Sequence, residues 1–247
     1  MIPKPASHKE LPLALVTGAA RRVGKALALH LAGRGFAVVL HYHTSADEVE
    51  QVRRAIAAIG VPVYPLRADL RDPREIHALF SSLRALPHRL TLLVNSAAVM
   101  TRSDLMEIDT HQWDDIMNIN ARAVWLCSRE AAELMPAGGL ILNMSDVGAR
   151  KTWTSYGAYV LSKGVVESLT GLMARQLAPR VRVCGIAPGL LMMGSFTSQD
   201  EWTALVEKVP LRRQSSLDEL LKVVDFLLEN EYVTGEIINL AGGYQLT

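Results

Sequence analysis

The fold of this chain is decided near its start, by Leu13-Ala-Leu-Val-Thr17-Gly18-Ala-Ala-Arg21-Arg22-Val23-Gly24. A mostly apolar run over residues 13–17 predicts a buried strand, and apolar residues at helical spacing over 23–32 predict a helix. The glycines between them let the backbone approach a pyrophosphate, whose charge suits the free N–H groups at the start of a helix. A plain glycine turn is the alternative. The position between a strand and a helix favours dinucleotide binding.

The same alternation of short apolar runs and longer helical patterns continues along the chain. Further strands are predicted at residues 37–42, 61–66, 90–95, 140–143, 181–186 and 236–240. Further helices are predicted at 46–59, 72–86 and 113–134, around 159–163 as far as Pro179, and after a capping box at Ser216 and Glu219. Because the strands are continuous apolar runs, both faces of the sheet should be covered.

We therefore predict an α/β fold, a single doubly wound Rossmann-type domain over residues 1–247. Its seven-stranded sheet should be mainly parallel, with helices on both faces. The cofactor half should span about residues 11–135 and the catalytic and substrate half about 136–247. A doubly wound fold binds its ligand at the carboxyl ends of the strands, and the polar motifs of this chain follow its strands directly.

The composition is that of a globular protein, with 49% hydrophobic and 21% charged residues and a formal net charge of +1. This charge gives no reason to expect nucleic acid or an acidic membrane surface as a partner. Cys127 and Cys184 lie in apolar stretches without metal-ligand spacing, so we expect buried thiols in a reducing compartment and no metal site. Residues 1–10 have no apolar core, which predicts no signal peptide, and no apolar run reaches the roughly 20 residues that span a bilayer. We expect a cytoplasmic enzyme.

The strongest chemical signal is the pair Tyr159 and Lys163, four residues apart on one helix face, with Asp146 thirteen residues before the tyrosine. A phenol has a pKa of about 10, and a nearby ammonium would lower it toward the working pH. The pattern predicts a proton donor or acceptor for the oxidation or reduction of a polar double bond. A solvated helix face is the alternative for the pair, and a backbone-capping residue is the alternative for Asp146.

The residues after the second strand indicate which dinucleotide is bound. A site for NAD carries an acid there to hold the ribose 2′-hydroxyl, but residues 41–45 read His-Tyr-His-Thr-Ser, and the first acid is Asp47. Arg21 from the glycine loop and Ser45 could bind a 2′-phosphate. We therefore expect NADPH. Asp47 and Glu48 also suit the start of the next helix, which is compatible with this expectation.

Three further positions suit a bound dinucleotide. Asp69 ends the third predicted strand and could accept a hydrogen bond from the adenine amino group, although a turn or capping role fits nearly as well. The small residues Asn-Ser-Ala-Ala at 95–98 leave room for a ribose. Pro188-Gly189 could expose backbone to a nicotinamide, but for this pair an ordinary turn is the better explanation.

Together these motifs resemble the short-chain dehydrogenase/reductase family over nearly the whole chain, from Thr17 to Gly243. The shared elements are the glycine loop, the segment 95–98, Asn120, the Tyr159/Lys163 pair and Pro188-Gly189. The resemblance of residues 113–120 implies that Asn120, not Asn118, is the catalytic asparagine. In the family this residue would hold a water that links the lysine to solvent.

Departures from the family pattern point to a subgroup. The family usually has glycine at the position of Arg22 and serine at that of Asp146. These residues, the His-Tyr-His-x-Ser segment and the final Gly-Gly-Tyr-x-Leu-Thr resemble pteridine reductases and bacterial dihydromonapterin and dihydrofolate reductases. The resemblance implies that Arg22 contacts pterin and phosphate and that Asp146 hydrogen-bonds Tyr159. Met100 stands where the subgroup stacks an aromatic ring on the pterin. It is a looser platform, so another flat heterocycle is an alternative substrate.

The resemblance implies NADPH-dependent reduction of a C=N bond in a pterin-type substrate. Catalysis would depend on Asp146, Tyr159, Lys163 and Asn120. Cofactor binding would involve Gly18, Arg21, Arg22, Val23, Gly24, His41, Tyr42, His43, Ser45, Asp69, Leu70, Asn95, Ser96, Ala97, Tyr159, Lys163, Pro188, Gly189 and Leu190. Substrate binding would involve Arg22, Ala98, Met100, Asp146, Tyr159, Leu191, Met192 and Trp202.

Several alternatives and a quaternary structure complete these expectations. The stretch from Gly194 that contains Trp202 could close over the substrate. The family likeness implies a homotetramer, with Ala158, Gly164 and Gly171 allowing helices to approach closely, although such small residues also pack inside monomers. An NADPH-dependent carbonyl reductase acting on a ketone or 3-oxoacyl thioester is the nearest alternative function. A catalytically silent nucleotide-sensing protein is an alternative from another class, which the complete set of catalytic residues disfavours.

Overall fold

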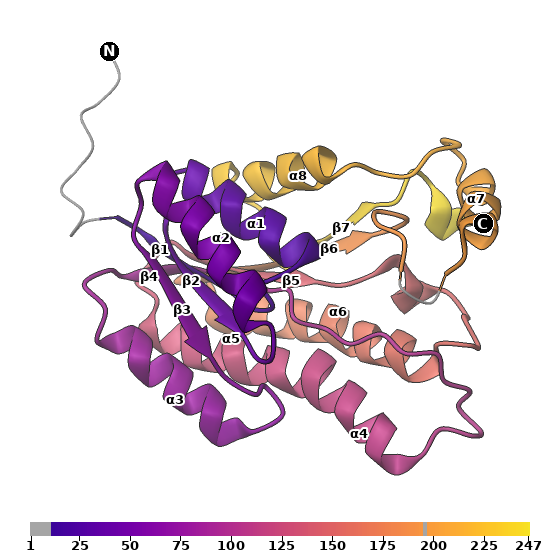
Figure 1. The fold of residues 1–247 in the computed structure, drawn as a ribbon, viewed down its shortest axis with the longest axis horizontal. Coiled ribbons are helices and arrows are strands. Elements are labelled where there is room, and N and C mark those ends of the chain that lie inside the picture. Colours follow the sequence, from indigo (N-terminus) through magenta and orange to yellow (C-terminus); the bar gives the residue numbers. More distant parts are fainter. Residues whose placement is uncertain (1–10, 195–196) are drawn as a thin grey trace. The chain divides into compact units, whose positions relative to one another are not determined.

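The computed structural model of the chain describes residues 11–194 and 197–247. The expectation of no signal peptide concerns residues 1–10 and lies outside the described residues. Within the described part, seven strands form one sheet in the order β3-β2-β1-β4-β5-β6-β7 (Figure 1). The strands are β1 Leu13–Val16, β2 Ala37–Tyr42, β3 Val63–Arg67, β4 Leu90–Asn95, β5 Gly139–Met144, β6 Val181–Pro188 and β7 Ile237–Leu240.

Strand pairing in this sheet is parallel, with β1 paired to both β2 and β4. In register, Leu13 lies opposite Ala37, and Gly185 of β6 lies opposite Ile237 of β7. The strand order reverses at β1, which is the arrangement of a doubly wound sheet. The predicted Rossmann-type α/β fold with a seven-stranded parallel sheet is therefore confirmed.

The helices follow the predicted pattern with local differences. They are α1 Arg22–Gly33, α2 Ala46–Ile59, α3 Pro73–Arg84, α4 Thr110–Met117, α5 Ala123–Leu134, α6 Gly157–Leu177, α7 Gln199–Lys208 and α8 Leu217–Glu229. The predicted helix over 113–134 begins earlier, and a π-helical turn over Asn118–Arg122 joins α4 to α5. The capping box at Ser216 and Glu219 opens α8 as predicted. An identical signal at Ser198 and Glu201 opens α7, a helix that was not predicted.

The chain divides into two compact units. Unit 1 comprises Met1–Ala97, Ala123–Leu142 and Leu177–Arg182, and unit 2 comprises Ala98–Arg122, Asn143–Gln176 and Val183–Thr247. The prediction of a single domain over residues 1–247 stays a prediction.

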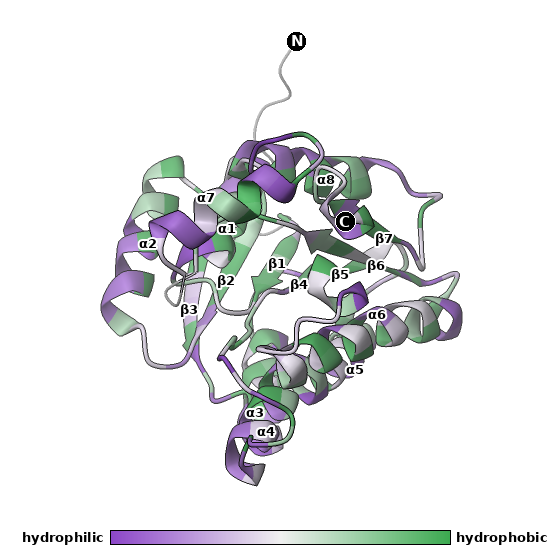
Figure 2. Ribbon diagram, turned by 90° about the vertical axis from the view of Figure 1, so that its right-hand side faces the viewer, coloured by the Kyte–Doolittle hydropathy of each residue, from purple (hydrophilic) through white to green (hydrophobic). Residues whose placement is uncertain are grey.

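Unit 1 contains β1 to β4, with α1 and α2 on one face of these strands and α3 and α5 on the other (Figures 1 and 2). Every residue of β1 is fully buried, which agrees with a strand covered on both faces. Apolar side chains of α3, among them Phe80 and Ile76, are also buried in this core. The core of unit 1 holds the loops that follow its strands in fixed positions.

Unit 2 contains β6 and β7, with α8 on one face of these strands and α6 on the other (Figure 2). Val147, Ala187, Val209, Ala241 and Tyr244 form a buried apolar cluster in this unit. The cluster brings the C-terminal segment against the turn that follows β5.

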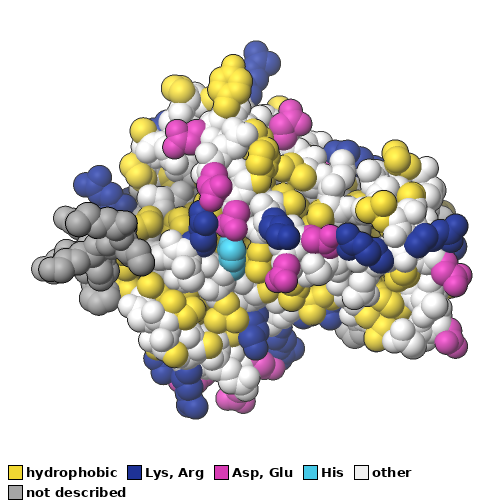
Figure 3. Space-filling model, turned by 90° about the horizontal axis from the view of Figure 1, so that it is seen from above, with side chains coloured by type: hydrophobic (Ala, Val, Ile, Leu, Met, Phe, Trp, Pro, Cys, Tyr) yellow, Lys and Arg dark blue, Asp and Glu magenta, His cyan; other side chains and the backbone are white. Residues whose placement is uncertain are grey.

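The surface carries charges of both signs. On the face drawn in Figure 3, Lys and Arg side chains are interspersed with Asp and Glu. No helix in the described residues has the length and apolar character needed to cross a membrane. Among these residues there is also no group of three or more His, Cys, Asp or Glu side chains that could hold a metal ion.

Candidate active site

A hydrogen bond joins Asp146 to Tyr159 in unit 2. Asp146 follows β5, and its Oδ1 accepts a 2.7 Å hydrogen bond from the amide of Gly148, which caps the 3-10 turn Val147–Arg150. Its Oδ2 accepts a 2.9 Å hydrogen bond from the Tyr159 hydroxyl near the start of α6. The capping role that was the alternative for Asp146 and the predicted contact with the tyrosine are therefore both present, one on each carboxylate oxygen.

The environment of this pair favours its protonated forms. Tyr159 is 6% exposed, and burial together with the Asp146 charge raises the pKa of the phenol well above its ordinary value. Burial of its carboxyl group also raises the pKa of Asp146. The residue as a whole is partly exposed. The expected lowering of the phenol pKa by an ammonium is absent in this structure, because desolvation and a neighbouring carboxylate dominate. The phenol is thus held as a proton donor.

Lys163 lies one helical turn after Tyr159 and is 4% exposed. Its Nζ donates a 2.7 Å hydrogen bond to the carbonyl oxygen of Met144, at the end of β5, and lies 5.7 Å from the centre of the Tyr159 ring. Burial lowers the pKa of Lys163 to about 8, and the Asp146 charge opposes this change. The lysine therefore carries its positive charge at neutral pH, directed at the strand end and the ring.

Asn120 lies in the π-helical turn and is fully buried, whereas Asn118 is partly exposed. Asn120 Oδ1 accepts a 2.8 Å hydrogen bond from the Val99 amide, and its Nδ2 donates to the Val99 carbonyl oxygen at 2.8 Å and to Ser162 Oγ at 3.1 Å. Ser162 in turn donates to the Tyr159 carbonyl oxygen. Asn120 thus joins the loop after β4 to α6, through a serine that sequence reasoning missed.

Ser145 precedes Asp146 and is the residue that could replace the family's serine. Its side chain is buried and donates a 3.2 Å hydrogen bond to Glu167 on α6. The other oxygen of Glu167 accepts a 2.9 Å hydrogen bond from Arg150. Ser145 therefore belongs to a structural network beside Asp146, and the Tyr159 hydroxyl donates its hydrogen bond to Asp146 instead.

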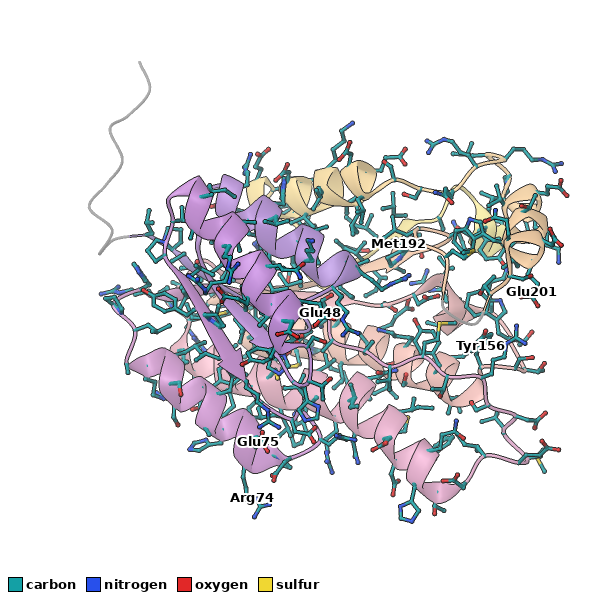
Figure 4. The ribbon with its side chains drawn as sticks, viewed as in Figure 1. Glu48, Arg74, Glu75, Tyr156, Met192 and Glu201 are labelled. Atoms are coloured by element: carbon teal, nitrogen blue, oxygen red, sulfur yellow. The ribbon has the colours of Figure 1, made fainter. Side chains whose placement is uncertain are left out.

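Apart from Asp146 and Tyr159, the residues of unit 2 expected to contact substrate lie on three segments. Ala98 and Met100 are exposed in the loop after β4, and Leu191 is buried after β6. Met192, labelled in Figure 4, is half-buried. The indole nitrogen of Trp202 on α7 donates a 2.8 Å hydrogen bond to Gln214. The indole N–H of Trp202 is thus already paired within α7 and the segment that follows it.

A polar link that the sequence did not predict connects two of these segments. Arg102, two residues after Met100, donates to the Tyr156 hydroxyl at 3.2 Å and pairs with Glu201 on α7 at 3.4 Å. Figure 4 shows Tyr156 and Glu201 on the same side of the molecule. The capping box at Ser198 and Glu201 was the available signal for α7, but no sequence pattern pairs Arg102 with a residue so distant in the chain.

The strand end at Pro188 and Gly189 is tightly packed within unit 2. The Gly189 amide donates to the Leu240 carbonyl oxygen, and a Cβ on Gly189 would lie 3.0 Å from Ala241. The Leu190 carbonyl oxygen accepts from the Ser215 amide. The close approach of the C-terminal segment thus explains the glycine without reference to a ligand.

In unit 1, the glycine loop depends on two glycines for its packing. Gly18 has φ +66°, and a Cβ there would lie 2.9 Å from Ala97. A Cβ on Gly24 would lie 2.1 Å from the Gly18 carbonyl oxygen. Arg22 takes φ 48°, in the left-handed region that favours glycine. The chain thus keeps an arginine where the backbone would prefer the family's glycine.

The start of α1 is suited to an anion. No side chain caps this end of the helix, and no acid lies in its first turn. The first N–H groups of a helix bear a partial positive charge. Val23 and Gly24 lie here, and the pyrophosphate site expected at this loop and helix start stays a prediction that this geometry fits.

Thr17 and Asn95 hold neighbouring strand ends together. The Thr17 hydroxyl accepts hydrogen bonds from the amides of Ser96 and Ala97, at 2.9 and 3.0 Å. Asn95 Nδ2 donates to Ser128 on α5 at 3.0 Å. Thr17, the first residue of the glycine loop, therefore also fixes the segment that follows β4.

His41 points into unit 1. It is 2% exposed, and its Nδ1 accepts a hydrogen bond from the Gly18 amide at 3.2 Å while Nε2 lies 3.0 Å from the Ala68 carbonyl oxygen. Burial lowers the pKa of His41 to about 4. A neutral imidazole thus fixes the glycine loop by accepting a hydrogen bond from the Gly18 backbone amide.

The remaining predicted cofactor residues surround the ends of β2 and β3. Tyr42 is half-buried at the end of β2 and Leu70 is buried after β3. Arg71 binds both carboxylate oxygens of Asp69 and lowers its pKa to about 2, and His43 lies 3.8 Å from this carboxylate. The Asp69 side chain is thus occupied by Arg71.

Comparisons with known proteins agree with this architecture. A family model described as enoyl-(acyl carrier protein) reductase matches residues 18–245. The 3-oxoacyl-[acyl-carrier-protein] reductase FabG of Staphylococcus aureus (strain Mu50) is 32% identical over 237 residues, which cover 93% of this chain and 96% of that protein. The chain belongs to the short-chain dehydrogenase/reductase family. The predicted resemblance is confirmed at this level.

Similar solved structures include enzymes that act on different kinds of substrate. FolM alternative dihydrofolate reductase 1 from Brucella canis, complexed with NADP, superposes with a TM-score of 0.90 and 31% identity, covering 96% of this chain and 94% of that one. The angucycline C-6 ketoreductase LanV with bound NADP superposes with a TM-score of 0.89 and 30% identity, covering 96% of each chain. Short-chain dehydrogenases/reductases use NAD(P), and the open start of α1 and the close-packed glycine loop fit such a cofactor.

Proposed function

We propose that this chain is an NADPH-dependent reductase that transfers hydride to a C=N bond of a pterin-type substrate, such as a dihydropterin, dihydromonapterin or dihydrofolate. The observation that carries the proposal is the 2.9 Å hydrogen bond from the Tyr159 hydroxyl to Asp146. It is supported by the FolM alternative dihydrofolate reductase among the similar structures. The acid Asp146 beside the phenol distinguishes this chain from most family members, which have a serine there.

The reaction adds one hydride and one proton across the double bond. The cofactor, when bound, supplies the hydride to the carbon. Tyr159 supplies the proton to the nitrogen, which its raised pKa allows because the phenol keeps that proton until charge develops on the substrate. Asp146 accepts the hydrogen bond that holds the hydroxyl in place. After transfer it can take a proton from solvent and pass it to the phenolate, since burial raises its own pKa.

Lys163 and Asn120 support this step from α6 and the π-helical turn. The Lys163 ammonium, 5.7 Å from the Tyr159 ring centre, stabilises the phenolate that proton transfer leaves behind. In this proposal it also holds the nicotinamide ribose hydroxyls. Asn120 keeps the loop at Val99 fixed against α6 and so maintains the position of Tyr159.

In the same proposal, further side chains bind the substrate and the cofactor. Arg22 contacts the pterin and the cofactor phosphate, and its left-handed backbone is the cost of keeping this side chain in the glycine loop. Arg21 and Ser45 bind the 2′-phosphate, which supports NADPH over NADH. Met100 packs against the flat ring through its sulfur, and Trp202 on α7 covers the substrate.

A carbonyl reductase acting on a ketone or 3-oxoacyl thioester is the second candidate. The FabG and LanV similarities favour it. Asp146 and the engagement of Ser145 with Glu167 count against it, because the hydroxyl that would polarise a carbonyl beside Tyr159 is committed elsewhere.

The test is a substrate panel with wild-type protein. Initial rates of NADPH and NADH oxidation would be measured with dihydrobiopterin, dihydromonapterin, dihydrofolate and several ketones. We expect turnover of at least one pterin with NADPH. Turnover of ketones alone would replace the proposed function with the second candidate.

We also propose that the protein is a cytoplasmic homotetramer. Cys127 and Cys184 are buried and form no disulfide, which supports a reducing compartment. Leu161, Val165 and Leu172 are exposed on α6 beside Gly164, and this apolar groove supports contact with a second copy. Ala158 is fully buried in its own chain, which fits the alternative that this small residue packs inside the monomer. Light scattering on a Leu172→Glu variant tests the contact, since loss of the tetramer is expected.

A further inference from the structure

Arg21 and Glu48 form an ion pair between the glycine loop and the first turn of α2. The contact joins Arg21 Nη2 to Glu48 Oε1, and Glu48 projects from the N-terminal end of α2 (Figure 4). Solvent still reaches 61% of the Arg21 side chain and 38% of the Glu48 side chain. An incoming anion can therefore reach the guanidinium and take the place of the carboxylate.

The other charged groups after β2 and β3 are arranged differently. Arg71 binds Asp69 with two nitrogens, so this acid already has a cation of its own. Asp47 is the second acid in the first turn of α2 and is exposed. Among the ion pairs of the described residues, Glu48 is the acid that Arg21 contacts. Asp47 therefore offers a matched comparison, with the same charge at the neighbouring position.

We propose that Glu48 is a specificity-determining residue that competes with the cofactor 2′-phosphate for Arg21 and so limits the preference for NADPH over NADH. This inference rests on the proposed NADPH dependence, with Arg21 as a phosphate-binding residue. A phosphate must draw Arg21 away from Glu48, and the released carboxylate then lies near a second negative group that repels it. A cofactor without the 2′-phosphate leaves the ion pair intact and meets neither cost.

The size of the effect follows from the exposure of the pair. Ion pairs that solvent screens are weak, so the competition should change affinity by about threefold to tenfold and not by orders of magnitude. The effect should also shrink at high salt, because salt screens both the pair and the repulsion.

Binding of two nucleotide fragments tests the proposal without turnover. Isothermal titration calorimetry would measure 2′,5′-ADP, which carries the 2′-phosphate, and 5′-AMP, which lacks it. The proteins are wild type, Glu48→Gln, Asp47→Asn, Arg21→Gln and the double variant Arg21→Gln/Glu48→Gln. We expect Glu48→Gln to bind 2′,5′-ADP about threefold to tenfold more tightly and 5′-AMP as the wild type does. Asp47→Asn should gain less, and Glu48→Gln should gain nothing in the Arg21→Gln background.

The outcomes separate this inference from the proposed function. Unchanged or weaker 2′,5′-ADP binding by a folded Glu48→Gln protein, checked by thermal melting, would overturn the inference. An equal gain in Asp47→Asn, or a gain that persists without Arg21, would overturn it as well, since general charge would then be the cause. If wild type binds both fragments equally, the proposed NADPH dependence fails. The inference survives that result only if Glu48→Gln acquires selectivity for 2′,5′-ADP.

Discussion

Two sets of titratable side chains, the candidate catalytic residues of unit 2 and the surface ion pairs after β2 and β3 of unit 1, contrast in burial and in what sets their pKa values. In unit 2, Tyr159 and Lys163 are almost fully buried, and desolvation is the largest cause of their shifted pKa values. In unit 1, Arg21 pairs with Glu48 at the surface, and Arg71 lowers the pKa of Asp69 chiefly through hydrogen bonds. Buried groups with shifted pKa values suit proton transfer. Exposed ion pairs, which an incoming anion can displace, suit ligand binding.

The largest effect on catalysis should come from the buried residue Tyr159. Tyr159→Phe removes the proton donor and should lower kcat by about a thousandfold, within the range of a positioned general acid. Cofactor affinity should change little. Steady-state kinetics on the active pterin would measure the loss. Tyr156→Phe is the matched control, because this phenol contacts Arg102 and not Asp146, and an equal loss there would contradict the assignment.

The pH dependence of stability tests the buried histidine of unit 1. His41 has a pKa of about 4 in the folded protein against 6.5 in the unfolded chain. The unfolded state therefore binds more protons between these values, so stability is complete above pH 6.5 and falls by about 3 kcal/mol as the pH drops toward 4. Urea unfolding at several pH values between about 8 and about 4.5 would measure this fall in the free energy of unfolding.

A variant isolates the contribution of His41. His41→Asn keeps an acceptor for the Gly18 amide but does not titrate, so it should be less stable at neutral pH and lose less stability on acidification. If the variant and the wild type follow the same pH course, the buried imidazole is not the cause.

Substitution of Arg22 should have smaller effects, which increase stability but weaken substrate binding. Arg22→Gly relieves a left-handed backbone and should raise the melting temperature by about 1–4 °C, while KM for the pterin rises. Arg212→Gly is the matched control, because Arg212 also has a positive φ, of 54°. This control should leave KM unchanged. A rise in KM for Arg212→Gly, or none for Arg22→Gly, would remove Arg22 from the binding site.

Local patterns explain how much of the fold the sequence predicts. Apolar runs place β2 and β4 at their observed bounds, because strands buried on both faces must be continuously apolar. The third strand begins two residues later than predicted, at Val63. The π-helical turn at Asn118–Arg122 follows from contacts of Asn120 with Val99 and Ser162, which no local pattern records.

The sequence likewise predicts some features of the candidate site and not others. The spacing of Asp146, Tyr159 and Lys163 predicts a shared location because the helix and the preceding strand fix it, and the structure brings these three together. The pKa of Tyr159 was not predictable, since it depends on burial that only the folded chain provides. Pairs such as Arg102 with Glu201 likewise join residues distant in sequence, and charge patterns alone do not select them.

The most direct test of the central claim is the activity of Asp146→Ser, which restores the family's usual residue beside Tyr159. Rates with NADPH would be measured for the active pterin and for a ketone panel, beside wild type. We predict that pterin turnover falls by about a hundredfold, because the phenol loses the acid that holds and reprotonates it, while ketone turnover is kept or gained. Pterin turnover that survives in Asp146→Ser would contradict the role of Asp146 and move this chain to the general carbonyl reductases.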